Sequence, residues 1–475
     1  MVISHIIFFI LSQLLISVSG SGLLSLIGWR ATNLLEFICT SFLVGIAGFY
    51  FILFVLMIVS VPLSLMLVWG ILLIGTGLAV FLAFRDKQPA LLVEGINPSM
   101  PNLLVSLWTT TSVLKKILIV LMAVSLMFKL IMSLWFVLAT PPYFDDAIGN
   151  WNIRGKAIFY EQGIYFDKSR TDVSYIAGGN LIHYPLLPPL VKAGEAAFVG
   201  EWVENFLNTL HLFTLIAFMS IFWTRLLRKT ADLFSSLLFP FLIASSPVLF
   251  FHSFAAFSDL LVGILLALSL LYFTEWVEQN TENINGAIPT LVLSGIMLFA
   301  ACSTKNEGFV FGFTSISTAA LIFAAKERNW RYMLPSTIAF VLLLPSIIMR
   351  ILFDLSLSPV PNDSFSYHEG TFAQIIDVMV NFGHHNIFWY VVPMLLLFFL
   401  GKNQRNKRSV QFAGIVVTVF FSLLIFTFGW TSSHAWLANQ TTINRSLMQY
   451  SASLIVFLSL LIEGRNYNSH GNSFS

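Results

Sequence analysis

The sequence is poor in charged residues and in cysteine, and each shortage excludes classes of protein. Charged residues make up 10% of the 475 residues, against about 25% in soluble domains. So few charges exclude a soluble globule, a disordered chain and a basic nucleic-acid binder. The net charge of +2 indicates no anionic partner. The two cysteines, Cys39 and Cys302, lie in apolar stretches, so no disulfide framework is expected.

Apolar side chains are abundant instead. Hydrophobic residues make up 57% of the chain, 47 residues are Phe, and the mean hydropathy is +0.84. Soluble domains contain about 45–50% apolar residues. Length alone would suggest about three soluble domains, but this composition indicates a surface that faces lipid. The sequence therefore predicts an all-α polytopic membrane protein.

Thirteen apolar segments are long enough, or nearly so, to cross a hydrocarbon core of about 30 Å. We expect these spans at about residues 4–27, 36–59, 61–84, 117–139, 208–226, 236–252, 257–275, 288–303, 308–325, 332–353, 387–400, 411–430 and 447–463. The first span is interrupted by Ser19-Gly20-Ser21-Gly22. It lacks a basic n-region and a small-residue cleavage site, so it is expected to be an anchor rather than a signal peptide.

The distribution of Lys and Arg predicts the orientation. Alternate loops carry sixteen of the 25 basic residues, the opposite side carries seven, and Lys129 and Arg350 fall within spans. The side with sixteen is expected to be cytoplasmic, which puts the N-terminus outside and the C-terminus inside. The outer side then receives loops at about 141–207, 354–386 and 431–446. We expect a bacterial inner membrane, with these loops facing the periplasm or exterior.

The first outer loop opens with an acidic pair, Asp145 and Asp146, directly after a span. A carboxylate near a desolvated site can act as a general base. Alternatively, the pair caps a helix that begins at Ala147, where acids favour the N-terminal dipole. Residues 147–160 lack proline and are predicted to be helical, whereas Pro185, Pro188 and Pro189 are predicted to break the later part of the loop.

Two further clusters fall on the same predicted face. Lys305 and Glu307 lie in a tight turn between two spans, where the ammonium could bind phosphate or the two could form an internal ion pair. Arg445 opens the last span, where it could bind phosphate or lie at the interface as a snorkelling cation. Asp259 begins another span and suits a helix cap. Trp151 and Trp436 could stack on sugar rings, although Trp is common at membrane interfaces.

Carboxylates, phosphate-binding cations and aromatic rings beside lipid suit transfer of a sugar from a lipid-linked phosphate donor. The ordered motifs resemble the glycosyltransferase C-type (GT-C) superfamily, in its branch of protein O-mannosyltransferases, aminoarabinose transferases and related polyprenyl-phosphate-sugar transferases. The motifs are Phe144-Asp145-Asp146-Ala147 with Trp151 and His183-Tyr184-Pro185, Ala256-Phe257-Ser258-Asp259-Leu260, Thr304-Lys305-Asn306-Glu307-Gly308 and Thr441-Thr442-Ile443-Asn444-Arg445.

The resemblance implies a GT-C-like catalytic module over about residues 117–463. It leaves residues 1–116, with three additional spans, and a short tail at 464–475 outside that module. It also implies an inverting transfer from a polyprenyl-phosphate-linked sugar to a hydroxyl on a lipid, glycan or protein acceptor of the cell envelope. Membrane lipids are further partners, and no nucleic acid is expected.

The resemblance also implies roles for individual residues. Asp145 would be the base that deprotonates the acceptor, and Asp146 would position a substrate. Lys305 and Arg445 would bind the donor phosphate. If the reaction uses a divalent cation, Asp146 or Glu307 would hold it. Residues in supporting or substrate-binding roles would be Glu307, Asp259, Trp151, His183, Tyr184 and Trp436.

A transporter or flippase of a phosphate-bearing lipid or a lipid-linked sugar is the alternative. It would use the same cations for binding only. Transporters place ionisable residues near mid-membrane, often at broken helices in paired repeats. Here Lys129 is the clear mid-span charge and no repeat is evident, so the enzyme is the favoured hypothesis. An O-antigen ligase or polymerase of another fold would share the outer arginines but would not require the acidic pair.

Overall fold

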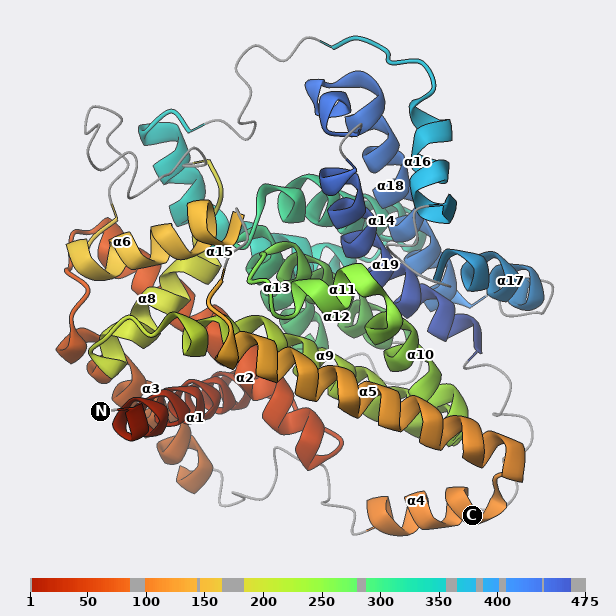
Figure 1. The fold of residues 1–475 in the computed structure, drawn as a ribbon, viewed down its shortest axis with the longest axis horizontal. Helices are drawn as coiled ribbons and strands as arrows, with labels where there is room; N and C mark the ends of the chain where they lie inside the picture. Colours follow the sequence, from red (N-terminus) through yellow and green to blue (C-terminus); the bar gives the residue numbers. More distant parts are fainter. Residues whose placement is uncertain are drawn as a thin grey trace.

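The computed structural model describes residues 2–85, 99–142, 146–164, 183–279, 288–355, 365–381, 388–400, 407–437 and 440–462 (Figure 1). Within these ranges the chain is built from helices and contains no β-strand. The predicted all-α architecture is therefore confirmed, and the composition explains it. In lipid, backbone polar groups must be satisfied within the chain, and a helix does this locally.

The helices follow one another without a large soluble domain among the described residues. The first part of the chain forms α1 (Val2–Ile27), α2 (Leu34–Ile58), α3 (Leu65–Arg85), α4 (Ser99–Thr110), α5 (Val113–Ala139), η1 (Ala147–Asn152), α6 (Ile153–Glu161) and α8 (Leu187–Val199). The middle forms α9 (Glu204–Thr230), α10 (Leu233–Ser245), α11 (Pro247–His252), α12 (Asp259–Gln279) and α13 (Ile288–Cys302). The last part forms η4 (Gly308–Phe313), α14 (Thr314–Glu327), η5 (Trp330–Met333), α15 (Leu334–Leu352), α16 (Thr371–Asn381), α17 (Phe388–Leu400), α18 (Arg408–Trp430), η7 (Ser432–Trp436) and α19 (Thr441–Ile462).

Each predicted span coincides with a helical segment, but the predicted number of thirteen spans is not confirmed. Ten helices in the described ranges are long and apolar enough to cross a membrane. Three apolar segments, Leu233–Ser245, Ile288–Cys302 and Phe388–Leu397, are shorter than a full crossing. Length and composition thus support a multi-pass membrane protein with ten candidate spans.

The predicted span at 236–252 is interrupted, and proline is the reason. α10 ends at Ser245, and α11 begins at Pro247. Ser246 between them has φ −64° and ψ 120°, which is extended rather than helical backbone. A residue before proline is pushed out of the α region by the proline ring, so the chain breaks the helix at this position.

The first outer loop is more helical than predicted. Residues 147–160 are helical as expected, in η1 and α6. The expectation that Pro188 and Pro189 break the later part is wrong, because they lie at the start of α8. Proline is tolerated in the first helical turn, where its missing N–H has no intrahelical partner to lose. Nearly all of α8 is buried, against α1, α2, α6 and α9.

α12 is the centre of the bundle (Figure 1). Its most apolar 18-residue window is 100% buried inside the protein. It packs on α9, α13, α18 and α19, which surround it. Asp259 opens this helix and Glu275 lies in its last turns, so α12 carries a carboxylate near each end of the bundle.

The first two helices cross at glycine. A Cβ at Gly20 would meet the carbonyl oxygen of Ser41 and the backbone of Gly45, and a Cβ at Gly45 would meet the carbonyl of Ile16. The interruption predicted at Ser19-Gly20-Ser21-Gly22 is therefore a close helix contact, since α1 continues through it. Small residues let backbones approach where lipid gives helices no hydrophobic drive to associate.

The mid-span charge of Lys129 is satisfied inside the bundle. Its ammonium donates a 2.7 Å hydrogen bond to the carbonyl oxygen of Ala244, at the end of α10. It also lies 5.6 Å from the centroid of the Phe250 ring. Lys129 thus joins α5 to the break between α10 and α11.

We expect Gly20→Ala to destabilise the protein by about 1–3 kcal/mol, because the added methyl group must separate α1 from α2. Gly77→Ala is the matched control on α3, where a Cβ meets nothing within 4 Å. Alanine should stabilise that helix slightly, since glycine is costly in a helix interior. Thermal unfolding of the purified variants in detergent would check both signs. Equal stability of the two variants would contradict the close α1–α2 contact.

Candidate functional site

Five of the predicted site residues lie together, although they are far apart in the sequence. Asp146 precedes η1, Asp259 opens α12, Lys305 and Glu307 lie between α13 and η4, and Arg445 is in the first turns of α19. We call these five residues the charged cluster. Asp145, the predicted base, lies outside the described residues.

Lys305 is the centre of the charged cluster. Its ammonium is 2.8 Å from Asp259 Oδ1 and 2.7 Å from Glu307 Oε1. Burial alone would lower the pKa of this amine, but the two carboxylates raise it above its ordinary value, so Lys305 stays charged. Asp259 Oδ1 also accepts a 2.9 Å hydrogen bond from Gln449 Nε2 of α19. Asp259 therefore pairs with a cation across helices, in addition to opening α12.

Arg445 pairs with Asp146, which lies 299 residues earlier in the sequence. The guanidinium forms an ion pair with Asp146 and lies 4.6 Å from the centroid of the Phe257 ring. The Asp146 side chain makes no capping hydrogen bond to η1. The described geometry therefore favours an ion-pairing role for Asp146 over the helix-cap alternative, and it ties the first outer loop to α19.

Two carboxylate oxygens in the cluster retain unused hydrogen-bonding capacity. Asp259 Oδ2 and Glu307 Oε2 are buried and accept no hydrogen bond from any described residue. Buried polar atoms in native proteins nearly always have partners, so such atoms indicate a place for a ligand or water. Asp259 and Glu307 thus each keep one acceptor oxygen that the described residues do not use.

Aromatic rings form a wall beside the charges. The Tyr184 ring lies 5.4 Å from the Lys305 ammonium and 5.5 Å from the Trp151 ring. Burial, with the Glu307 charge adding to it, raises the pKa of the Tyr184 phenol, which keeps its O–H proton. Trp151 is 1% exposed and packs against the Tyr184 ring. Trp436 is half exposed in η7, which packs on α18 and α19.

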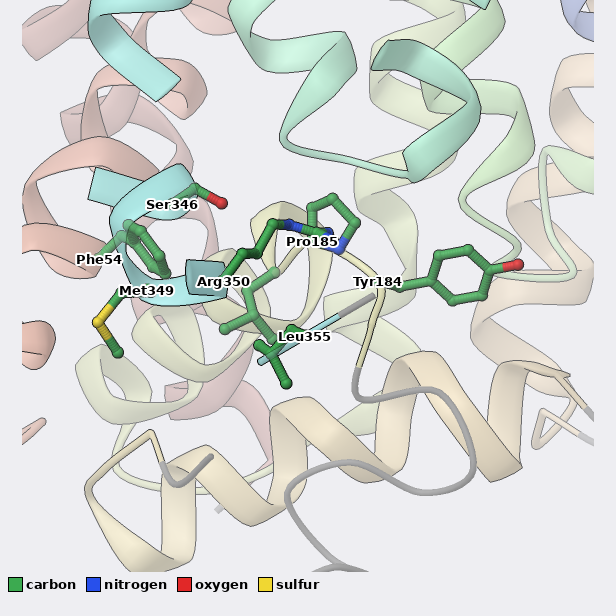
Figure 2. Close-up of a pocket in the computed structure, with 8 residues that line it drawn as sticks. Phe54, Tyr184, Pro185, Ser346, Met349, Arg350 and Leu355 are labelled. Atoms are coloured by element: carbon green, nitrogen blue, oxygen red, sulfur yellow. The ribbon is translucent and has the colours of Figure 1, made fainter. Parts of the chain in front are cut away.

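The segment with His183 and Tyr184 is held by two arginines that the motifs did not single out. Arg350 donates to the His183 carbonyl oxygen at 2.5 Å, and Arg154 donates to the Tyr184 carbonyl oxygen at 2.8 Å. Burial, reinforced by the Arg350 charge, lowers the pKa of Arg154 to about 9. His183 thus contributes through its backbone. Figure 2 shows Arg350 beside Pro185, with the Tyr184 side chain directed away from it.

Arg350 also lines a groove beside the charged cluster. The groove has a volume of about 580 Å³ and lies between α15 and the α13–η4 turn. Its walls include Phe309, Phe340 and Ile351, and the last two are among the exposed apolar residues of α15. Arg350 donates a 2.8 Å hydrogen bond to Asn306 Oδ1. The signal that could have identified Arg350 is its position as a cation within a predicted span, where charges are costly and often functional.

Comparisons with protein-family models, curated proteins and solved structures find no match for this chain. The charged cluster therefore has to be interpreted from its own chemistry. In the described part of the chain, no group of three or more His, Cys, Asp or Glu side chains is arranged to hold a metal ion. The possible divalent cation, which Asp146 or Glu307 would hold, stays a prediction.

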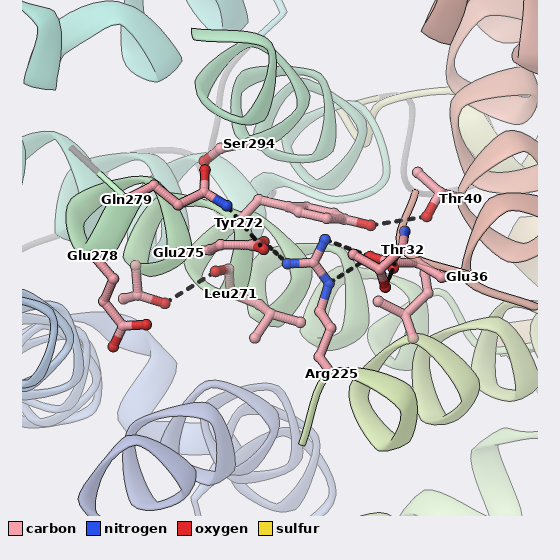
Figure 3. Close-up of polar contacts among 12 residues, drawn as sticks. Thr32, Glu36, Thr40, Arg225, Leu271, Tyr272, Glu275, Glu278, Gln279 and Ser294 are labelled. Carbon is pink, nitrogen blue, oxygen red and sulfur yellow. Dashed lines mark hydrogen bonds and ion pairs between the residues drawn. The ribbon is translucent and has the colours of Figure 1, made fainter. Parts of the chain in front are cut away.

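A second ionic cluster joins the helices at the opposite end of α12 (Figure 3). Arg225 of α9 lies 2.5 Å from Glu36 of α2 and forms a further ion pair with Glu275 of α12. Its guanidinium lies 4.6 Å from the Tyr272 ring centroid, and the Tyr272 hydroxyl is hydrogen-bonded to Thr40 at 3.0 Å. Lysine and arginine counting assigned the ends of these helices to the predicted cytoplasmic side. The predicted orientation itself stays a prediction.

A buried polar network lies behind η1, on α8. The Lys192 ammonium donates 2.8 Å hydrogen bonds to Asn152 and Asn208, and Glu195 accepts a 2.8 Å bond from Gln13. Both ionisable side chains are buried. Burial lowers the pKa of Lys192 to about 7 and raises the pKa of Glu195 to about 7. Lys192 contacts the end of η1, so it fixes the helix that follows Asp146.

The pKa of Glu195 predicts a pH-dependent stability. Because the folded-state pKa of about 7 exceeds the ordinary 4.5, the folded protein binds the extra proton between these values. Stability is then present below about pH 4.5 and is lost as the pH rises toward 7, by roughly 3 kcal/mol at most. Glu195→Gln should remove most of this loss, as measured by thermal unfolding between pH 5 and 8.

Glu161→Gln is the control, since Glu161 is an exposed acid of α6. It should leave the pH profile of unfolding unchanged. Lys192 does not mask the effect, because its lowered pKa makes stability rise with pH only above about 7. The same loss in wild type and in Glu195→Gln would contradict the assignment.

Proposed function

We propose that this protein is an integral membrane glycosyltransferase that moves a sugar from a polyprenyl-phosphate donor to an acceptor hydroxyl. The observation that carries the proposal is the position of Asn306. It lies between Lys305 and Glu307 in the charged cluster, and it accepts a hydrogen bond from Arg350 of the apolar groove. The charged cluster, with its unused acceptor oxygens, thus adjoins the apolar groove at Arg350. This arrangement suits a ligand that has a sugar, a phosphate and a hydrocarbon chain.

In this proposal the groove and the cations bind different parts of the donor. The groove beside α15 takes the first part of the isoprenoid chain, and Arg350 contacts the donor phosphate together with Lys305. A guanidinium binds phosphate oxygens in bidentate fashion, whereas the ammonium acts as a point charge. Because Lys305 and Arg445 are paired with carboxylates, the phosphate competes for their charge. Arg350 is therefore a phosphate ligand in addition to the two that the motifs predicted.

The chemical step is a displacement at the anomeric carbon. The acceptor oxygen forms a bond to that carbon on the face opposite the phosphate, and the carbon–oxygen bond to the phosphate breaks. Asp145 takes the acceptor proton, and the phosphate leaves with the bonding electron pair. The cations stabilise the negative charge that develops on the leaving group. Asp259 and Glu307 accept hydrogen bonds from sugar hydroxyls through their free oxygens.

Asp145→Asn tests the proposed base. The amide cannot take the acceptor proton, so the rate of transfer should fall about 10²- to 10⁴-fold, while the purified protein keeps its thermal stability. The assay follows release of radiolabelled sugar from a polyprenyl-phosphate donor in detergent without an energy source. Glu161→Gln, an exposed acid nearby in sequence, should transfer at the wild-type rate. Near-normal turnover by Asp145→Asn would refute the assignment of the base.

Arg350→Gln tests the phosphate contact. We expect the KM for the lipid-linked donor to rise about tenfold or more, which corresponds to roughly 1.4 kcal/mol of binding, with a smaller change in kcat. Arg331→Gln is the control, because Arg331 is an exposed cation of η5. A loss in kcat alone, with an unchanged KM, would place Arg350 outside the phosphate site.

Transport of the same lipid is the alternative, and the ionic cluster around Arg225 is the observation that favours it. Buried ion pairs at both ends of α12 could alternate as gates. The release assay separates the two functions, since a transporter releases no sugar. Absence of both hydrolysis and transfer across a panel of donors, with movement of labelled lipid between leaflets of proteoliposomes, would favour transport.

A further inference from the structure

The three N-terminal helices enclose a second groove, separate from the charged cluster. It lies between α2 and α3, with α1 contributing to its lining, and has a volume of about 480 Å³. Four glycines line it, namely Gly45 and Gly48 of α2 with Gly70 and Gly75 of α3. Ser19 of α1 is the one polar side chain in the lining, and its hydroxyl donates to the carbonyl oxygen of Leu72 at 3.4 Å. The groove is therefore apolar along its length.

The groove stays open because α3 is held from the other side. Trp69 of α3 stacks on Phe198 of α8 with ring centroids 4.3 Å apart. A Cβ at Gly75 would meet the Ser19 side chain, 2.5 Å away, so α3 packs closely on α1. α1 in turn packs closely on α2. With α3 anchored to α1 and α8, it does not collapse onto α2.

Gly70 lines the groove and leaves room there for a side chain. A Cβ built on it meets nothing within 4 Å, and its φ is not among the positive values. Glycine in a helix interior costs about 1 kcal/mol relative to alanine. A larger side chain at Gly70 would therefore take up volume in the groove without first displacing a neighbour.

The position of the groove indicates what fills it. Both walls are candidate spans, so the groove lies at the depth of lipid chains. On α2 the lining runs from Gly45 to Leu56, a length of about 17 Å, which is roughly half of a hydrocarbon core of about 30 Å. It ends toward the α2–α3 turn, where Leu63 N–H donates to the Gln162 carbonyl oxygen at 2.9 Å. Gln162 follows α6, so this end is on the side of the charged cluster.

We propose that the groove between α2 and α3 binds one hydrocarbon chain of a membrane lipid, from the leaflet on the side of the charged cluster. The rim suits a flexible chain better than a helix of a second copy. Met66 and Ile74 stand exposed at the opening, and the glycines lie between the helices rather than on a protruding ridge, where small residues support helix dimers. The inference does not rest on the proposed transferase activity.

Photolabelling of the full-length protein tests the site. The protein is reconstituted in nanodiscs that contain phosphatidylglycerol with a diazirine in one acyl chain. A parallel arm uses a polyprenyl phosphate with a diazirine in its isoprenoid chain. The labelled residues are identified by mass spectrometry, and the two arms distinguish an acyl chain from an isoprenoid. We expect labelling at Met66, Ile74 and Ile52 in at least one arm.

Gly70→Phe is the decisive variant, because nothing lies within 4 Å of a Cβ at this lining position and a ring there adds bulk to the groove. Labelling at the groove should fall about tenfold. Gly77→Phe is the control, because it adds the same ring to the same helix. Gly77 is exposed, a Cβ there meets nothing within 4 Å, and it does not line the groove. Labelling of this variant should not change. Gly70→Leu repeats the comparison with a smaller side chain if the Phe variant is not recovered.

Three outcomes would overturn the proposal. The first is no labelling at the groove in either arm. The second is equal labelling in wild type and Gly70→Phe, or an equal loss in Gly77→Phe. The third is efficient disulfide formation between two copies of a Met66→Cys variant, which would make a second copy the occupant. Absence of sugar transfer would leave this result unaffected, so failure of the proposed function is read separately.

Discussion

The structure depends on the pairing of buried charges at the two ends of α12. In lipid, helices gain little by exchanging one apolar neighbour for another, so polar contacts and close packing decide which helices meet. Asp259 joins α12 to Lys305 and to Gln449 of α19, and Glu275 joins it to Arg225 of α9. Removing one partner of such a pair leaves a buried charge unpaired, which costs about 3–5 kcal/mol. These pairs thus help to fix which helices surround α12.

Much of the architecture could be predicted from the sequence, because hydropathy acts locally. An apolar run forms a helix whatever its neighbours are, so every predicted span has a helical counterpart. Length in the folded protein is less local. The break at Ser246-Pro247 follows from the proline, whereas the predicted span was drawn from hydropathy alone. The helical role of Pro188 and Pro189 was predicted wrongly because a proline stops one helix and starts another with the same geometry.

The candidate site divides in the same way. Counting charges placed Asp146, Asp259, Lys305 and Arg445 on one face, and the structure brings them together. Their partners could not be predicted, since the Arg445–Asp146 pair joins positions 299 residues apart. Pairing also changes how each cation could bind phosphate, because the phosphate would have to compete with the carboxylate that already pairs with it. Arg350 was counted only as a charge within a span, and its contact with Asn306 required the turn to be placed in space.

The complete enclosure of α12 has a consequence for biosynthesis. A ribosome delivers helices in order, and α12 is made before three of the four helices that enclose it, α13, α18 and α19. Until α19 enters the bundle, Asp259 lacks Gln449 and one side of α12 faces lipid or a chaperone. The nascent chain therefore carries a carboxylate at the start of α12 that lacks one of its partners until α19 is made. An arrested chain thus exposes a face of α12 that the complete fold encloses.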